Sequence, residues 1–223
     1  MAKRKTKMSG RRARVLIVDD HPAVREALAI RIAGEADLEV CGEAADYADA
    51  VKLAAATRPD VAVIDLGLKS GNGIDLIKRL CTEHEQLLTI VWSMYSEELY
   101  AERALRAGAR GYINKEQATT MIVEAIRQVL DGNLYLSPAM TEKLLQRHVG
   151  IAAKSTSRDP IESLSTRELD VLRLIGQGVK TMDIARQMHL STKTVETYRD
   201  RIKKKLGLAH STELAQFAAQ SGL

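Results

Sequence analysis

The sequence predicts an α/β fold, with a doubly wound five-stranded parallel sheet, followed by a smaller all-α domain of four helices. Two patterns lead to this fold class. Between residues 14 and 131, short runs rich in β-branched residues alternate five times with amphipathic stretches of helix length. Such alternation is typical of a parallel sheet with right-handed crossovers and helices on both faces. After residue 164 only helical patterns occur.

Each predicted element has its own signal. The first and third strands are apolar nearly throughout, as expected of strands that are covered on both faces. The predicted strands are 14–18, 39–43, 61–65, 88–93 and 111–113, and the helices between them are 22–34, 46–57, 73–81, 97–107 and 117–131. Glycines separate the C-terminal helices, which are predicted over 165–176, 181–188, 192–206 and 211–220.

Composition shifts divide the chain into four parts. Residues 1–13 form a basic tail that we expect to be disordered, and residues 14–132 form the α/β domain. Residues 133–160 are expected to be a linker, in part helical, because the stretch from 150 onward is small, polar and without periodicity. Residues 161–223 form the helical domain.

The charge of +4 over 223 residues is unevenly distributed. Residues 1–14 carry +7, residues 15–160 carry −6 and residues 161–223 carry +3. An acidic body with a basic C-terminal part fits a nucleic-acid contact at one end of the molecule. A solvated charged surface is the alternative that charge alone leaves open.

Several features favour a cytoplasmic protein. No apolar run approaches the roughly 20 residues that a membrane helix requires. The apolar stretch after the basic tail is ended by Asp19 and Asp20, so it is not a signal peptide. Cys41 and Cys81 form no CxxC motif, and we expect both to be small core residues in a reducing compartment.

Three acidic residues lie at the carboxyl ends of predicted strands, where open α/β sheets bind ligands. Asp19 and Asp20 follow the first strand and Asp65 follows the third. Clustered carboxylates repel one another unless a cation neutralises them, and their hard oxygens suit Mg²⁺. Ser93 ends the fourth strand and Lys115 follows the fifth. Together they predict a phosphoryl-transfer site in which Asp65 is the nucleophile.

The segments VLIVDDHP, DVAVIDLGL with GNG after it, and GYINK resemble the receiver domain of two-component response regulators. The resemblance implies a flavodoxin-like fold in which Asp65 accepts the phosphoryl group and Lys115 contacts it. It also implies a Mg²⁺ site and a conformational switch. The implied metal ligands are Asp19, Asp20, Asp65 and the backbone carbonyl of Gly67, and the implied switch residues are Ser93 and Tyr112.

Lys69 and Tyr95 lie at positions that affect phosphorylation and its reversal in this family. Lys69 replaces the proline that usually lies four residues after the acceptor, so we expect a looser and more basic loop there. Tyr95 lies two residues beyond Ser93, at a position that tunes hydrolysis of the phosphate in this family. The acceptor chemistry is unaffected by Lys69, but the phosphorylation rate and lifetime are not predicted.

The helix predicted over 192–206 has one apolar and one polar side. Ser191 is a suitable N-cap, and the apolar stripe comprises Val195, Tyr198, Ile202 and Leu206. Residues 181–188 form a supporting helix, with a tight turn at His189 and Leu190. A helix that is buried on one side and polar-basic on the other can enter the major groove of DNA.

The segment LSTRELDVLRLIGQGVKTMDIARQMHLSTKTVETYRDRIKKKLGL resembles the LuxR-type helix-turn-helix of the NarL/FixJ subfamily. The resemblance implies base-edge contacts by Glu196, Thr197 and Asp200. It implies phosphate contacts by Lys193, Thr194, Arg201, Lys204 and Lys205. Lys180 occupies a position where a small capping hydroxyl is usual, and we expect Thr181 to provide that cap.

Three functions fit these patterns. The first is a DNA-binding transcription regulator that a partner histidine kinase phosphorylates on Asp65. Phosphorylation then releases the helix-turn-helix, and the chain binds paired half-sites of double-stranded DNA as a homodimer. The second is a constitutive DNA-binding protein with a receiver-like dimerisation domain, which Lys69 favours. The third is a Mg²⁺-dependent phosphatase resembling haloacid dehalogenases.

The phosphatase is the weakest of the three. The first strand ends in DDHPA instead of DxDxT, and His21, the nearby general-base candidate, fits better as a helix-start residue. We therefore expect no enzyme beyond slow self-dephosphorylation. No segment resembles a kinase dimerisation helix or a nucleotide-binding loop, so the phosphoryl donor is expected to be a separate protein.

Overall fold

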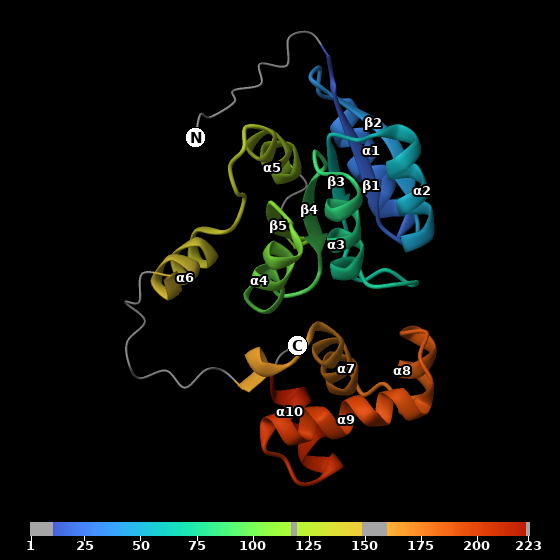
Figure 1. Ribbon diagram of the computed structural model, residues 1–223, viewed down its shortest axis with the longest axis vertical. Coiled ribbons are helices and arrows are strands. Elements are labelled where there is room, and N and C mark those ends of the chain that lie inside the picture. The colour runs from blue at the N-terminus through green and yellow to red at the C-terminus, as the bar shows by residue number, and fades with distance from the viewer. Residues whose placement is uncertain (1–10, 117–119, 149–159, 222–223) are drawn as a thin grey trace. The chain divides into compact units, whose positions relative to one another are not determined.

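The computed structural model describes residues 11–116, 120–148 and 160–221 (Figure 1). The chain divides into two compact units, Met1–Thr141 and Glu142–Leu223. The predicted disordered tail lies outside the described residues up to residue 10, and Ala13 already belongs to the first strand. The described helices are all too short or too polar to span a membrane.

The first unit contains a five-stranded parallel sheet in the order β2-β1-β3-β4-β5. The strands are β1 (Ala13–Val18), β2 (Leu38–Ala44), β3 (Val61–Ile64), β4 (Leu88–Ser93) and β5 (Gly111–Asn114). All five were predicted, with ends that agree within one residue. Chain order reverses direction between β1 and β3, so the crevice for ligands lies at the carboxyl ends of these two strands.

Helices cover both faces of this sheet, as the alternating pattern predicted. They are α1 (Pro22–Ala33), α2 (Tyr47–Thr57), α3 (Gly73–Glu83), α4 (Glu97–Ala107) and α5 (Thr120–Leu130). Val15 and Ile17 of β1 are buried in a core shared with α1 and α5. Leu16 points to the other face, where it lies beside Leu53 of α2, because side chains alternate along a strand.

Local side chains set where helices begin and end. Asn72 caps α3, since its side-chain oxygen accepts hydrogen bonds from the backbone N–H groups of Ile74 and Asp75 at 2.9 and 3.2 Å. Gly108 ends α4 with a φ of 115°, a left-handed conformation that glycine adopts without strain. Asn72 lies in the loop after β3, at the sheet edge that carries the acidic residues, whereas Gly108 lies in the loop that leads back to the start of β5.

The start of the predicted linker belongs to the first unit. The backbone N–H of Tyr112 donates to the carbonyl of Tyr135 at 2.9 Å, so this segment lies along β5. A helix follows, α6 (Pro138–His148), and the N–H of Ser137 before it donates to Glu97 at 2.9 Å. Residues 149–159 of the predicted linker lie outside the described residues.

The second unit is all-α. After the C-terminal part of α6, its described elements are the short 3₁₀ helix η1 (Pro160–Ser163) and the helices α7 (Thr166–Gly176), α8 (Thr181–Gln187), α9 (Thr192–Leu206) and α10 (Ser211–Gln220). Its core is built from apolar residues of all four α-helices, with Leu172, Ile184, Val195 and Leu214 fully buried. The four predicted helices are therefore present, with ends that agree within one residue.

The expectation for the two cysteines was wrong. Cys41 and Cys81 are half-buried, not in the core, and both are free thiols. Their sulfur atoms contact threonine hydroxyls, with Cys41 Sγ 3.5 Å from Thr57 Oγ1 and Cys81 Sγ 3.7 Å from Thr89 Oγ1. Both occupy the edges of apolar segments, where a small polarisable side chain is accepted without full burial.

Gly73 provides a test of how closely α3 approaches the acceptor loop. A Cβ atom there would lie 2.5 Å from the carbonyl oxygen of Asp65 and 2.5 Å from Leu66 Cα, both backbone atoms. Gly73→Ala should therefore lower the free energy of unfolding of this unit by about 1–3 kcal/mol, as measured by urea denaturation.

Gly34→Ala is the matched control. A Cβ at Gly34 meets nothing closer than 3.5 Å, and its φ of −69° suits alanine. This substitution should leave stability unchanged or raise it by about 0.4–1 kcal/mol. Equal effects of the two substitutions would contradict the close packing of α3 on the acceptor loop.

Candidate functional site

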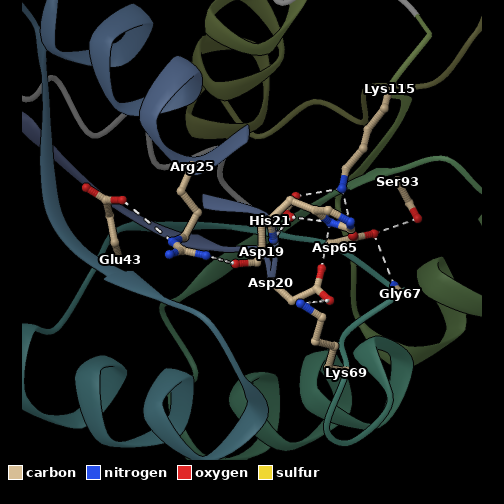
Figure 2. Close-up of polar contacts among 10 residues, drawn as sticks. All are labelled: Asp19, Asp20, His21, Arg25, Glu43, Asp65, Gly67, Lys69, Ser93 and Lys115. Carbon is tan, nitrogen blue, oxygen red and sulfur yellow. Dashed lines mark hydrogen bonds and ion pairs between the residues drawn. The ribbon is translucent and has the colours of Figure 1, made fainter. Parts of the chain in front are cut away.

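The three predicted acidic residues meet at the carboxyl edge of the sheet (Figure 2). Asp19 and Asp20 follow β1, Asp65 follows β3, and the two strands pair directly. One carboxylate oxygen from each, together with a ring nitrogen of His21, lie within 4.8 Å of one another. All three acids are buried, with exposed fractions of 1%, 8% and 5%. The site is therefore a buried cluster of negative charge.

Asp65 is held by three donors from three segments. Ser93 Oγ, at the end of β4, donates to Asp65 Oδ1 at 2.8 Å, and the backbone N–H of Gly67 donates to the same oxygen at 3.1 Å. Lys115 Nζ, after β5, donates to Asp65 Oδ2 at 2.6 Å. The structure thus brings Ser93 and Lys115 to the carboxylate, and it brings the N–H of Gly67, whose carbonyl was the group predicted to act.

Lys115 also joins Asp65 to Asp19, because its ammonium group lies 2.6 Å from Asp19 Oδ2. Burial, the largest single influence, lowers the pKa of Lys115, but Asp65 and Asp19 together raise it above its ordinary value. The lysine is therefore a permanent cation at neutral pH. It compensates two of the three carboxylates.

Asp20 has different neighbours. His21 Nδ1 lies 2.7 Å from Asp20 Oδ1, yet the alignment makes no hydrogen bond, and this buried oxygen accepts none. On the other side, Lys69 Nζ lies 3.8 Å from Asp20 Oδ2. His21 begins α1, as predicted, at the N-cap position. It was named from the sequence as the nearby general-base candidate, and the structure places its ring nitrogen within the acidic cluster.

Arg25 is a residue that the sequence analysis missed. Its guanidinium group donates to the backbone carbonyl of Asp19 at 2.6 Å and lies 3.8 Å from Glu43 of β2 (Figure 2). The contact fixes the backbone just where β1 ends. No sequence pattern predicted it, since an arginine in the first turns of an amphipathic helix is usually solvated.

Two tyrosines lie beside the acceptor. Tyr112 is 1% exposed, and its hydroxyl donates to the carbonyl of Tyr95 at 2.9 Å. Burial and the nearby charge of Asp65 hold the pKa of Tyr112 well above its usual range. A Cβ at Gly67 would lie 3.2 Å from the Tyr95 hydroxyl and 3.7 Å from Asp65 Oδ2, so Tyr95 extends over the acceptor loop.

In the second unit, α9 has the two sides that were predicted. Val195 and Ile202 are fully buried, whereas Tyr198 and Leu206 are partly buried against the same core. Seven of the eight predicted DNA-contacting residues are exposed, and Thr194 is half-buried. The exposed ones are Lys193, Glu196, Thr197, Asp200, Arg201, Lys204 and Lys205. Ser191 caps the helix by accepting from the N–H of Thr194 at 3.0 Å.

The turn between α8 and α9 was also predicted correctly. His189 adopts a left-handed conformation with a φ of 53°, which reverses the chain within a few residues. The prediction for Thr181 was wrong. Lys180 occupies the N-cap position of α8 without a side-chain cap, and the hydroxyl of Thr181 donates instead to Glu196 of α9 at 3.0 Å. The Thr181 hydroxyl therefore links α8 to α9.

Lys205 makes contacts that the sequence did not suggest. Its ammonium group donates to the buried carboxylate of Glu168 at 2.6 Å and to the carbonyl of Ser163 at 3.0 Å. Glu168 also completes a capping box with Ser165 at the start of α7. Burial by itself raises the pKa of Glu168, but Lys205 and Ser165 together hold it below its ordinary value.

Comparison with known proteins assigns both units. Residues 15–127 match the response regulator receiver domain, and residues 162–218 match the bacterial regulatory proteins of the luxR family. The chain therefore belongs to the response regulators that combine these two domains. This confirms the resemblance seen in the sequence and the predicted fold class.

Individual proteins are similar over most of their length. The oxygen regulatory protein NreC of Staphylococcus carnosus is 34% identical over 214 residues, which cover 94% of this chain and 98% of that protein. The DNA-binding transcriptional activator DevR/DosR of Mycobacterium tuberculosis is 34% identical over 207 residues, covering 93% and 94%. The solved structure of the RcsB response regulator of Salmonella typhimurium is 25% identical and aligns with a TM-score of 0.70 over 94% of this chain and 98% of that chain.

The Glu168–Lys205 pair predicts a pH dependence. Because the pKa of Glu168 is lowered on folding, its charge stabilises the second unit above about pH 4.5, and this contribution is lost as the pH falls through the folded-state pKa. Lys205→Met leaves Glu168 buried without its cation. The second unit should then lose on the order of 1–2 kcal/mol at neutral pH, less than a fully buried pair would lose, because Lys205 is partly exposed.

Hydrogen exchange of α7 and α9 peptides in the full chain, corrected for intrinsic rates, measures this effect. Lys205→Met should show lower protection at neutral pH, and should lose less further protection than the unsubstituted chain as Glu168 protonates, because Lys205 no longer lowers the pKa of Glu168. Lys204→Met removes a neighbouring exposed lysine and is the control. If both variants behave alike, the pair does not hold α9 to α7.

Proposed function

We propose that this response regulator accepts a phosphoryl group on Asp65 and that this modification controls DNA binding by its C-terminal domain in the cytoplasm. The observation that carries the proposal is the environment of Asp65. Its carboxylate is buried between a hydroxyl, a backbone N–H and an ammonium group, next to two further carboxylates. The receiver domain extends over about residues 14–132 and the DNA-binding domain over 161–223.

The residues of the cluster fit a Mg²⁺ ion. Asp19, Asp20 and Asp65 offer hard carboxylate oxygens, and Asp20 Oδ1 is buried without a hydrogen-bond partner. We propose these three residues and the backbone carbonyl of Gly67 as the protein ligands. Bound there, Mg²⁺ would neutralise charge on the incoming phosphoryl oxygens. The fit rests on the donor set and on Asp20 Oδ1, a buried oxygen that accepts no hydrogen bond from the described residues.

The protein's own groups account for the rest of the transfer. A carboxylate oxygen of Asp65 forms a bond to phosphorus while the bond from phosphorus to the imidazole nitrogen of a kinase phosphohistidine breaks. Lys115, which now contacts Asp65, is placed to pair with a phosphoryl oxygen. The chain is then a phosphoryl acceptor, and its only turnover is slow loss of its own phosphoryl group.

Ser93 and Tyr112 are proposed to transmit the modification. Ser93 Oγ donates to Asp65 Oδ1 in the unmodified protein, and a phosphoryl oxygen would offer this hydroxyl a stronger acceptor. Tyr112 belongs to the same edge through its hydrogen bond to the carbonyl of Tyr95, two residues after Ser93. Movement of Ser93 would therefore shift the Tyr95 segment, to which the Tyr112 hydroxyl is bonded. We propose that this segment and Tyr112 form a two-state element that a phosphoryl group on Asp65 biases.

For the second domain we propose that α9 enters the major groove of double-stranded DNA. Among the proteins similar over almost the whole chain, DevR/DosR is described as a DNA-binding transcriptional activator. Glu196, Thr197 and Asp200 are proposed to contact base edges. The residues proposed to contact phosphates are Lys193, Thr194, Arg201, Lys204 and Lys205. Phosphorylation would release this domain and allow a homodimer to bind paired half-sites.

The central test uses beryllofluoride as a phosphate mimic with Mg²⁺. It should tighten binding of the full chain to an operator, selected from random DNA, by about tenfold or more, which corresponds to the coupling free energies typical of allosteric proteins. Fluorescence anisotropy with labelled DNA measures the change. Asp65→Asn keeps the size of the side chain but removes the charge, and should abolish the response without changing basal affinity.

Two results would contradict this proposal in different ways. Equal DNA affinity with and without the mimic in the unsubstituted chain would favour a constitutive regulator with a receiver-like dimerisation domain. A response that persists in Asp65→Asn would place the acceptor elsewhere. In both cases the binding of DNA by the second domain is tested separately by the affinity of the unmodified chain.

The proposed phosphate contacts make a prediction that salt dependence can resolve. Lys204→Ala should weaken binding to operator and random DNA alike, and should reduce the slope of log affinity against log salt by about 0.9, the loss of one phosphate contact. Lys205→Ala should change the slope less, because its ammonium group is engaged by Glu168 and Ser163. Equal slopes for the two variants would show that Lys205 also contacts phosphate.

A further inference from the structure

Lys69 gives the acidic cluster a second lysine, on the side opposite Lys115. It lies in the loop between β3 and α3, and its Nζ is 3.8 Å from Asp20 Oδ2 (Figure 2). The two ends of this ion pair differ in environment, since the side chain of Lys69 is 77% exposed and that of Asp20 is 5% exposed. An exposed ammonium group therefore faces a buried carboxylate.

The neighbouring positive charges indicate which of the three carboxylates Lys69 affects, namely Asp20. Lys115 is within hydrogen-bonding distance of Asp19 and Asp65, at 2.6 Å from each. Arg25 is directed at the carbonyl of Asp19 and at Glu43. Among the lysines and arginines that the structure describes, it is Lys69 that forms an ion pair with Asp20.

We propose that Lys69 competes with the divalent cation for Asp20 and so weakens metal binding to the unphosphorylated protein. This inference rests on the proposed Mg²⁺ site. A metal ion bound through Asp20 would lie within a few ångströms of the ammonium group, and like charges at that distance repel. Lys69 must therefore withdraw before the ion binds at full strength.

Exposure of Lys69 sets the size of this effect. An exposed ammonium group on a flexible four-carbon stem can leave Asp20 and become hydrated, so Lys69 weakens the metal site without blocking it. Two charges 4 Å apart in water interact by an amount that corresponds to about fivefold in a dissociation constant. Phosphorylation of Asp65 would then require a higher Mg²⁺ concentration than in a chain with a neutral residue at position 69.

Isothermal titration of the full chain with MgCl₂ alone tests the proposal, with no phosphoryl donor or DNA present. Lys69→Met, which keeps most of the length of the side chain, should bind Mg²⁺ about fivefold more tightly than the unsubstituted chain. Lys69→Arg keeps the charge and should bind with nearly the original affinity. Lys78→Met removes an exposed lysine of α3 that forms no ion pair with Asp20 among the described residues, and should change little.

Salt dependence separates charge competition from a change in loop structure. The ratio of affinities between Lys69→Met and the unsubstituted chain should approach one at about 1 M NaCl, where the screening length falls to about 3 Å. A ratio that stays constant with salt would show that Lys69 acts on the shape of the loop, and would overturn the proposal.

The outcomes distinguish this inference from the function on which it rests. If the unsubstituted chain and Lys69→Met bind Mg²⁺ equally, the competition is wrong and the metal site remains. If neither chain binds Mg²⁺ in the titration, the metal site itself is wrong, and the inference is wrong with it. Binding by Lys69→Met alone would support both.

Discussion

The Lys115 ammonium group is the contact on which the whole acidic edge depends. It lies 2.6 Å from Asp19 and 2.6 Å from Asp65, and so ties the ends of β1, β3 and β5 together. Two buried carboxylates would otherwise repel each other across neighbouring strands, and buried charge without compensation is strongly destabilising. Because the lysine follows β5, at the far edge of the sheet from β2, it links the acidic cluster to the segment that carries Tyr112.

The contacts of Asp65 determine which groups must move when its carboxylate is modified. Asp65 shares its hydrogen-bond donors with segments that follow β3, β4 and β5, so any group added to the carboxylate must rearrange Ser93, Gly67 or Lys115. Ser93 lies two residues before the carbonyl that holds the Tyr112 hydroxyl. Asp20 lies outside this set, and its partners, Lys69 and His21, are more exposed. The partners of Asp65 are therefore more enclosed than the partners of Asp20.

Much of the fold and most of the site were predictable because they depend on local pattern. Short runs rich in β-branched residues predicted all five strands to within one residue at their ends. Helical patterns separated by glycines predicted the four C-terminal helices equally closely. Asp19, Asp65 and Lys115 follow strands, and parallel strands bring such residues to one edge whatever the helices do. The misses involve side chains that reach between segments. Arg25 contacts the backbone of Asp19, Thr181 contacts Glu196 in place of its own helix, and Lys205 contacts Glu168.

The sequence by itself determined which residues meet at the carboxyl edge of the sheet and which side of α9 is polar, because period and strand order decide both. Only the tertiary structure decided how the charges pair. A long lysine side chain can reach several acids, and its choice depends on burial and on competing acceptors. Lys115 is enclosed between Asp19 and Asp65, whereas Lys69 remains in solvent beside Asp20. Residue types alone do not distinguish these two environments, since burial is a property of the packed chain.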